Sequence, residues 1–334
     1  MSAEITQFGT TPAGEIVEKI TIGSDALSAS ILTWGAVLQD VRLCGVDHSL
    51  TLGGPDLAAY SGPMKSFGSV IGPVVNRIRG ASAPIAGVTH RFEANMDGAH
   101  TKHGGTHGPH VSVWRIIETS PTHAVLELAL PDGLSGFPGN RVIRAEYRVI
   151  DAALDLVLVA QTDTATLINL ANHSYWNLDG SLDAGGHLVQ IFAENFTEND
   201  TDLMVTGRVM PVEGKQYDFR TPTRFAASPD RMFDLNYVLA DAKRPLTRAA
   251  RITGEAGITM EMSTTEPGLQ LFDFGSFDTG NFIGHHGAPY PSYSGIALEA
   301  QGWPDAANHD GWPSIEVTPN APYHQHTRWA FSAD

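Results

Sequence analysis

Alternation of apolar and polar residues with a period of two runs along most of the chain and predicts many β-strands. The segments that carry this pattern or a short apolar run are 15–23, 29–43, 113–118, 123–130, 141–150, 154–161, 165–175, 257–263, 269–274, 296–301 and 323–331. The run 29–43 is long, and Gly35 is the position where it could break. Short turn sequences, such as Glu266-Pro267-Gly268, separate several of these segments and indicate antiparallel hairpins.

Helical patterns are few and short. Residues 55–60 and 229–233 could each form one or two turns. Strands crowd both halves of the chain, with no internal repeat and no low-complexity linker between them. We therefore predict an all-β protein, a large antiparallel β-sandwich with few short helices, in which residues 1–334 form a single domain.

The composition agrees with an all-β protein and limits the classes of possible binding partner. Hydrophobic residues make up 42% of the 334 residues and charged residues only 17%, against roughly 25% charged in an average domain. The formal net charge of −16 disfavours nucleic acid and anionic membranes as partners, because both require a basic face. Cys44 is the single cysteine, the start shows no signal-peptide pattern and no stretch reaches the ~18 apolar residues of a membrane span. We expect a cytoplasmic protein.

Two polar residues stand in unusual apolar settings. Glu299 directly follows the apolar run 295–298, a setting in which a carboxylate is costly unless it is paired or functional. His173 lies in the segment 169–178, which mixes apolar positions with Asn, Ser and aromatic residues at the end of a strand run. Each residue taken alone is also compatible with a structural role at a sheet rim.

Two further segments hold candidate ligand-binding side chains. Arg77 lies between apolar neighbours in a chain with few basic residues, and a guanidinium can contact two sugar hydroxyls or one carboxylate. His103, His107 and His110 fall within a Gly-rich stretch. Its glycines and proline break regular metal-ligand spacing, so a loop that brings one histidine to a ligand is favoured over a zinc site.

Taken in order, these segments resemble the aldose 1-epimerase (galactose mutarotase) family, over residues 14–331. The matching motifs are Val75-Asn76-Arg77-Ile78, Lys102-His103-Gly104-Gly105, Asn172-His173-Ser174-Tyr175-Trp176-Asn177-Leu178, Tyr217-Asp218-Phe219-Arg220-Thr221-Pro222, Phe233-Asp234-Leu235-Asn236-Tyr237-Val238-Leu239, Pro267-Gly268-Leu269-Gln270, Leu298-Glu299-Ala300-Gln301 and Pro304-Asp305-Ala306. The ordered set is far more specific than any single motif.

The resemblance implies an enzyme that interconverts the α and β anomers of a free aldose on the concave sheet of a β-sandwich. It implies Glu299 as general base and His173 as general acid, and no metal or organic cofactor. By the same match, the side chains expected to bind sugar hydroxyls are Asn76, Arg77, His103, Asp234 and Gln270. The expected partner is a monosaccharide, and the oligomeric state is left open.

The chemistry suits these residue types. Opening a cyclic hemiacetal requires removal of the anomeric hydroxyl proton and protonation of the ring oxygen. A carboxylate and an imidazole can perform the two transfers. Rotation about C1–C2 and the reverse transfers then close the other anomer. Trp176, Tyr175 and Trp303 are candidates for an aromatic platform under the sugar, with core packing as the alternative.

The sequence departs from the family pattern at Pro73, in residues 106–112 and around 283–293, which leaves the preferred aldose open. Three alternatives remain. A hexose-phosphate 1-epimerase on the same fold would need extra Lys or Arg at the groove. A non-catalytic carbohydrate-binding sandwich would not need both Glu299 and His173. A glycoside hydrolase would use a carboxylate pair such as Asp234 with Glu299, but would give His173 no task.

Overall fold

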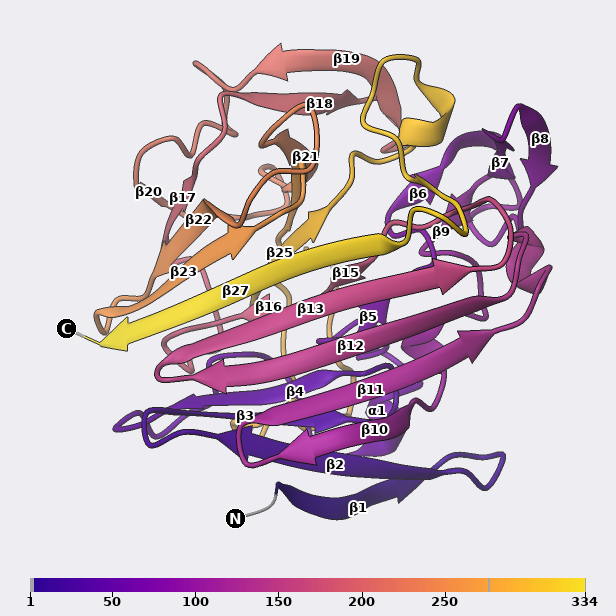
Figure 1. Ribbon diagram of the computed structural model, residues 1–334. Helices are drawn as coiled ribbons and strands as arrows, with labels where there is room; N and C mark the ends of the chain where they lie inside the picture. The colour runs from indigo at the N-terminus through magenta and orange to yellow at the C-terminus, as the bar shows by residue number, and fades with distance from the viewer. Residues whose placement is uncertain (1–2, 276, 334) are drawn as a thin grey trace.

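Two large antiparallel sheets face each other in the structure, a computed structural model that describes residues 3–275 and 277–333 (Figure 1). The nine strands of the first sheet are, in spatial order, β10 (Arg115–Ser120), β11 (His123–Leu130), β12 (Arg141–Ile150), β13 (Ala153–Thr162), β27 (Tyr323–Ala333), β23 (Ile258–Thr264), β22 (Thr247–Thr253), β17 (Leu188–Ile191) and β20 (Thr223–Arg224). Strands β12, β13 and β27 are its longest and run side by side across the molecule (Figure 1).

The second sheet has six strands, which are, in spatial order, β16 (Tyr175–Trp176), β25 (Ile296–Gln301), β24 (Gly268–Phe272), β21 (Asp234–Val238), β18 (Asn195–Asn199) and β19 (Val205–Pro211). In Figure 1, β16 and β25 lie behind the long strands of the first sheet, and β18, β19 and β21 lie above them. All of its pairings are antiparallel. The predicted all-β, antiparallel class is confirmed.

Smaller elements complete the described chain. The N-terminal sheet consists of β1 (Glu4–Thr10), β2 (Ile16–Gly23), β3 (Leu27–Leu32) and β4 (Leu38–Leu43). The two-stranded pairs are β5 (Val70–Ile71) with β15 (Ala171–Asn172), β6 (Arg77–Ile78) with β9 (Thr101–Lys102), β7 (Ser82–Ile85) with β8 (Val88–Arg91), and β14 (Thr166–Leu167) with β26 (Glu316–Val317). The short helix is α1 (Leu57–Tyr60), and 3-10 turns span Arg79–Ala81, Pro109–Val111, Leu134–Gly136 and Ala306–Asn308.

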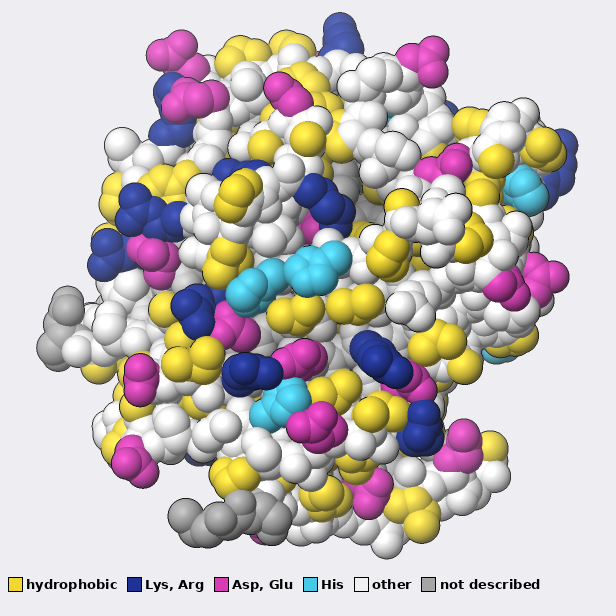
Figure 2. All heavy atoms as spheres, in the orientation of Figure 1, with side chains coloured by type: hydrophobic (Ala, Val, Ile, Leu, Met, Phe, Trp, Pro, Cys, Tyr) yellow, Lys and Arg dark blue, Asp and Glu magenta, His cyan; other side chains and the backbone are white. Residues whose placement is uncertain are grey.

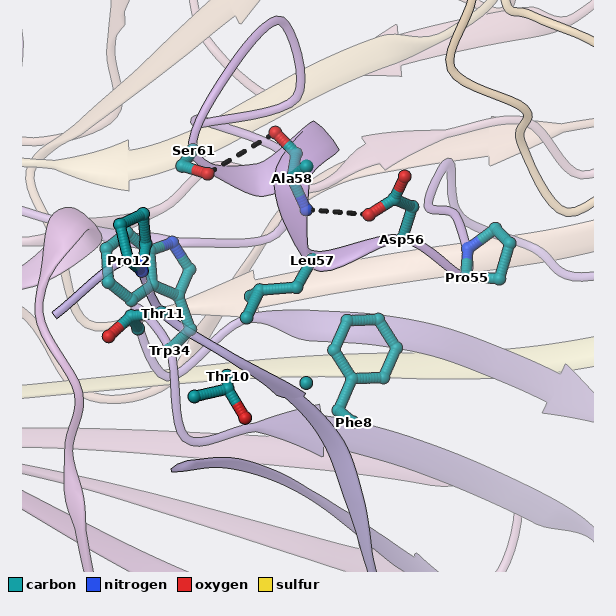
Figure 3. A pocket seen from close by; sticks show the side chains of 11 residues that line it. Phe8, Thr10, Thr11, Pro12, Trp34, Pro55, Asp56, Leu57, Ala58 and Ser61 are labelled. Atoms are coloured by element: carbon teal, nitrogen blue, oxygen red, sulfur yellow. Dashed lines mark hydrogen bonds between the residues drawn. The ribbon is translucent and has the colours of Figure 1, made fainter. Parts of the chain in front are cut away.

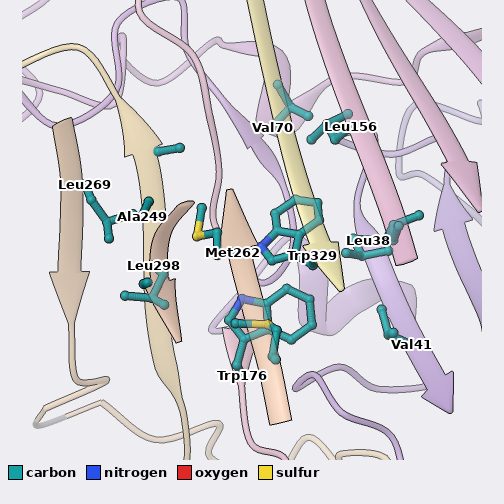
Figure 4. Packing of buried hydrophobic residues seen from close by; sticks show 14 of the residues in the cluster. Leu38, Val41, Val70, Leu156, Trp176, Ala249, Met262, Leu269, Leu298 and Trp329 are labelled. Carbon is teal, nitrogen blue, oxygen red and sulfur yellow. The ribbon is translucent and has the colours of Figure 1, made fainter. Parts of the chain in front are cut away.

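The main core fills the space between the two large sheets (Figure 4). Trp329 of β27 packs on Trp176 of β16, with ring centroids 5.6 Å apart. Leu269 and Leu298 point into the same core from β24 and β25 (Figure 4). Trp176 is therefore a core residue, so core packing, and not a role as a sugar platform, is confirmed for this ring. No helix among the described residues has the length and apolar character that crossing a bilayer would demand.

Two local expectations are wrong. Residues 165–175 do not form one strand, because asparagine side chains replace the ladder: Asn169 bonds the backbone of Gly302, and Asn172 donates to the Gly68 carbonyl at 2.7 Å. Residues 229–233 are not helical, because Ser228 and Arg231 form an isolated bridge around a tight turn. The break in 29–43 is confirmed, since β3 ends at Leu32 and β4 begins at Leu38.

Candidate active site

The pleat of the six-stranded sheet separates core positions from site positions. On β25, Leu298 and Ala300 belong to the main core, so the side chain of Glu299 points to the opposite face. Gln270 lies directly opposite Glu299 on β24, and Asn236 lies directly opposite Gln270 on β21. Three buried polar side chains thus form a row across three neighbouring strands.

A second row lies beside the first on the same face. Asp234 of β21 lies opposite Phe272 of β24, which lies opposite Ala297 of β25. Ala297 in turn lies opposite Tyr175 of β16. The first row is therefore polar, and the second holds one carboxylate, one alanine and two aromatic side chains. The period-two relation between Gln270 and Phe272 is the sequence signal that could have revealed Phe272, which the prediction missed.

His173 reaches this face from the turn between β15 and β16. Its backbone is held by Ser69 and Gly68, through bonds of 3.0 and 3.1 Å. Its ring packs beside Tyr175, with centroids 5.0 Å apart, and its Nε2 lies 3.4 Å from Oε1 of Glu299. Both side chains are almost fully buried, and Glu299 Oε2 and His173 Nδ1 have no hydrogen-bond partner within the described chain.

Burial sets the protonation of this pair. Loss of solvation raises the pKa of Glu299 to about 8, and the negative charge of Asp234 acts in the same direction. Loss of solvation lowers the pKa of His173 to about 4. Between these values the two groups hold one proton between them. Shifts of this size in a shared site are typical of functional groups.

The five predicted sugar-binding residues lie in one connected network. Arg77 Nη2 contacts Asp234 Oδ2 at 2.9 Å, and Gln270 Nε2 donates to Asp234 Oδ1 at 2.5 Å. Asn76 donates to Gln270 Oε1 at 3.0 Å, and the Asn76 backbone N–H donates to Nδ1 of His103 at 3.3 Å. The structure therefore brings these side chains together from four segments far apart in the sequence.

Local backbone geometry positions His103 within that network. His103 and Gly104 have positive φ angles of 52° and 76°, and a Cβ on Gly104 would overlap the carbonyl oxygen of Gly72. Glycine is therefore required where the chain turns back against the 72–73 segment. The His103 ring lies 5.8 Å from that of His173, edge to face.

A pocket of about 510 Å³ opens over the two histidines. His103 and His173 line it, together with an aromatic wall of Tyr175, Phe272 and Phe277. Glu299 and Arg77 are not among its lining residues. Both side chains are buried: Glu299 lies against His173, and Arg77 lies against Asp234.

Two lysines and one of the three proposed aromatic residues also line this pocket. Lys65 and Lys102 line the pocket, although the sequence analysis assigns neither of them a role. Trp303 lies elsewhere, packed on Trp312 at 5.1 Å with its Nε1 donating to the Pro267 carbonyl, so only Tyr175 of the three proposed aromatic residues lines the pocket.

Another pocket of about 510 Å³ lies between β1 and α1 (Figure 3). Its walls include Phe8, Trp34 and Leu57. Asp56 is the one charged side chain among the described residues that line it, and its Oδ1 accepts the Ala58 N–H at the start of α1. This pocket has the same volume as the pocket over His173, but its described lining residues include no carboxylate–histidine pair.

Comparison with known proteins agrees with this geometry. The sequence model of a family described as aldose 1-epimerase matches residues 18–330. The chain belongs to the aldose 1-epimerase family. Members of this family are isomerases that interconvert the anomers of free aldoses, as the sequence predicted.

Individual relatives extend over nearly the full length. The chain is 33% identical to a galactose mutarotase of Homo sapiens, over 96% of each chain. It is 27% identical to an aldose 1-epimerase of Escherichia coli, over 97% of each. Among solved structures, an aldose epimerase homologue from C. elegans has a TM-score of 0.87 at 27% identity, covering 94% of this chain and 98% of that one. A galactose 1-epimerase from Lactobacillus acidophilus has a TM-score of 0.85 at 25% identity, covering 99% and 98%.

Proposed function

We propose that this aldose 1-epimerase acts through Glu299 as general base and His173 as general acid on a free monosaccharide. The observation that carries the proposal is the buried pair itself, with 3.4 Å between Nε2 and Oε1 and further polar atoms left without partners. A sugar with its anomeric hydroxyl at the carboxylate and its ring oxygen at the imidazole would satisfy both groups. Each positioned group would contribute typically ~10²–10⁴-fold.

The one proton shared by the pair supports the cycle. The pKa values favour this proton on Glu299 between pH 4 and pH 8, so the cycle would begin with its transfer to His173. Glu299 is then ionised and can take the anomeric proton while the imidazolium protonates the ring oxygen. The ring opens to the aldehyde, C1–C2 rotates and the reverse transfers restore the starting protonation. No proton has to enter or leave the site, which suits a buried location.

We assign substrate binding to the network behind the pair. The Arg77 guanidinium and the His103 ring would donate to sugar oxygens, and Asp234 would accept from a hydroxyl. Gln270 donates to Asp234 at 2.5 Å and accepts from Asn76 at 3.0 Å, which preorganises these groups before substrate arrives. Preorganised polar groups of this kind favour a carbohydrate over an apolar ligand.

A non-catalytic binding role is the rival from a different functional class, and polarimetry separates it from catalysis. Freshly dissolved α-D-galactose or α-D-glucose should reach its equilibrium rotation faster with the protein than in buffer. A panel of α-anomers, followed by NMR of the anomeric proton, would rank the aldoses. If no aldose equilibrates faster than in buffer while sugars still bind, the protein is a carbohydrate-binding sandwich.

Two wider expectations remain proposals. Residues 1–334 would form a single domain, which is supported by a main core that draws on residues from Ile20 to Phe331. One cooperative unfolding transition would agree with this. A cytoplasmic location is supported by the single, free Cys44, which suits a reducing compartment.

A further inference from the structure

Lysine is rare in this chain, and two of its lysines lie at the candidate active site. The sequence has five lysines, at positions 19, 65, 102, 215 and 243, in a chain with a formal net charge of −16. Lys65 and Lys102 both line the pocket over His173. Two of the few ammonium groups of a strongly acidic protein therefore lie at the pocket that a sugar would enter.

The register of the small β6–β9 pair shows where Lys102 points. Lys102 lies directly opposite Arg77 in this antiparallel pair. Residues directly opposite each other in antiparallel strands project from the same face. Lys102 therefore projects toward the site as Arg77 does, but it is half-buried at the pocket wall, whereas Arg77 is buried behind it against Asp234.

Among the described residues, the ammonium of Lys102 forms no salt bridge and no hydrogen bond. Lys102 enters the hydrogen-bond network of the described residues only through its backbone, which pairs with the side chain of Asn95. Lys243 shows the opposite arrangement: its Nζ lies 2.5 Å from Glu266 and 4.0 Å from the centre of the Tyr323 ring. A half-buried ammonium is costly when unpaired, so the contrast indicates that Lys102 is kept for something that enters the pocket.

The charges around Lys102 leave room for an anion. Asp97 is the one acidic side chain among the described residues that line the pocket. Burial lowers the pKa of Lys102, and the nearby charge of Arg77 lowers it further, while Asp234 and Glu299 act in the opposite direction. Arg77 is already occupied by Asp234 at 2.9 Å, so the unpaired positive charge at the wall is that of the lysines.

We propose that Lys102, assisted by Lys65, is a specificity residue that recognises an anionic substituent on the aldose, a carboxylate or a phosphate remote from the anomeric carbon. This inference rests on the proposed function and names the substrate class of the same site. The sugar ring would occupy the Glu299–His173 pair, and its anionic group would point outward to the two ammonium groups. A uronic acid and a hexose 6-phosphate are the two simplest sugars of this chemistry.

The test compares each anionic sugar with its neutral parent. The kcat/KM for anomer exchange is measured for D-galacturonate and galactose 6-phosphate against D-galactose, and for the glucose series likewise. The ratio of anionic to neutral kcat/KM should exceed one for at least one anionic series, and the series with the larger ratio identifies carboxylate or phosphate. A charge-assisted contact predicts that Lys102→Met lowers this ratio by about tenfold to a hundredfold.

Matched variants separate recognition from general electrostatics. Lys102→Arg should keep most of the ratio, Lys65→Met should lower it by a few-fold, and Lys19→Met, on the distant strand β2, should leave it unchanged. A wild-type ratio of one or less in every series would overturn the inference while the turnover of neutral sugars still supports the proposed function. An equal loss for neutral and anionic sugars in Lys102→Met would also overturn it, because Lys102 would then act through the charge of Glu299.

Discussion

Two carboxylate–histidine pairs of the structure differ in their hydrogen bonding. In the pair of Asp155 and His326 the carboxylate is fully hydrogen-bonded, whereas in the pair of Glu299 and His173 it is not, among the described residues. Asp155 lies on the outer face of the nine-stranded sheet, with His326 Nε2 at 2.7 Å. Arg328 adds two more bonds to the same carboxylate, at 2.9 and 2.7 Å. On this face Lys and Arg side chains are interspersed with Asp and Glu (Figure 2), so such pairs hold one another in place.

The difference in partners explains the difference in protonation. Although burial opposes ionisation of Asp155, hydrogen bonds from His326 and Arg328 outweigh it and lower its pKa. Glu299 has no such donor, and its burial raises the pKa to about 8. A satisfied pair contributes to stability, whereas an unsatisfied pair costs stability and remains available to a ligand. The comparison supports the proposal that the Glu299–His173 pair carries the chemistry.

The largest expected effect is on turnover in Glu299→Gln. The amide cannot accept the anomeric proton, so kcat should fall by ~10²–10⁴-fold while the fold is retained. The matched variant is Asp155→Asn, which should keep kcat within about twofold and lose about 1–3 kcal/mol of unfolding free energy. Anomer exchange by NMR and urea unfolding measure the two quantities. Near-normal turnover in Glu299→Gln would remove this residue from the mechanism.

His173→Asn should follow with a loss of ~10²–10³-fold in kcat, because the amide cannot deliver a proton to the ring oxygen. His326→Asn is its control on the outer face and should leave kcat unchanged. Equal losses in the two variants would show that a general destabilisation, rather than proton transfer, explains the result. Circular dichroism at the assay temperature checks that both variants are folded.

How well a strand can be predicted from the sequence depends on whether one or both faces of its sheet are covered. Strands β12 and β25 are predicted with their observed bounds, because β12 alternates cleanly and β25 is a short apolar run. Strand β21 is missed, since Leu235, Asn236 and Tyr237 are buried in succession and no period of two remains. Strands with both faces covered lose the alternating pattern on which single-sequence prediction depends.

The candidate site shows the same limit. The motifs around Glu299 and His173 are sufficient to indicate both residues from the sequence alone. The contact of Arg77 with Asp234 joins positions 157 residues apart, and no local pattern encodes it. Lys102 belongs to a matching motif, but the sequence assigns it no role, because spacing cannot show that β9 lies against β6 or that its ammonium makes no side-chain contact with a carboxylate within hydrogen-bonding distance among the described residues. The Arg77–Asp234 contact and the position of Lys102 depend on strand pairing between distant segments, which local residue propensities do not encode.

A difference in pH-dependent stability should separate the two carboxylates further. Glu299 ionises near its ordinary value of 4.5 in the unfolded chain but near 8 in the fold. The unfolding free energy therefore falls between these pH values, by about 1.4 kcal/mol per pH unit from this group alone. Glu299→Gln should gain about 2–4 kcal/mol relative to wild type by pH 8.

His173 acts in the opposite direction between pH 4 and its ordinary value of 6.5, because the fold keeps it neutral. Comparing Glu299→Gln with wild type cancels that contribution. For Asp155 the pKa is lowered, so its stabilisation is present above pH 3.8 and is lost as the pH falls through the folded value. Asp155→Asn should thus approach wild-type stability in acid, the reverse of the Glu299 trend. Parallel curves for both variants would refute the assignment.

The smallest effect expected is in substrate binding through arginine. Arg77→Ala removes a donor from the network that holds Asp234 and should raise KM about tenfold, with a smaller change in kcat. Arg328→Ala removes a guanidinium from Asp155 on the outer face and should leave KM unchanged. The two arginines contact their carboxylates at 2.9 and 2.7 Å, so loss of an ion pair is common to both variants. Only a position within reach of the sugar explains a KM that responds to one and not to the other; unchanged kinetics in Arg77→Ala would place that arginine outside the binding site.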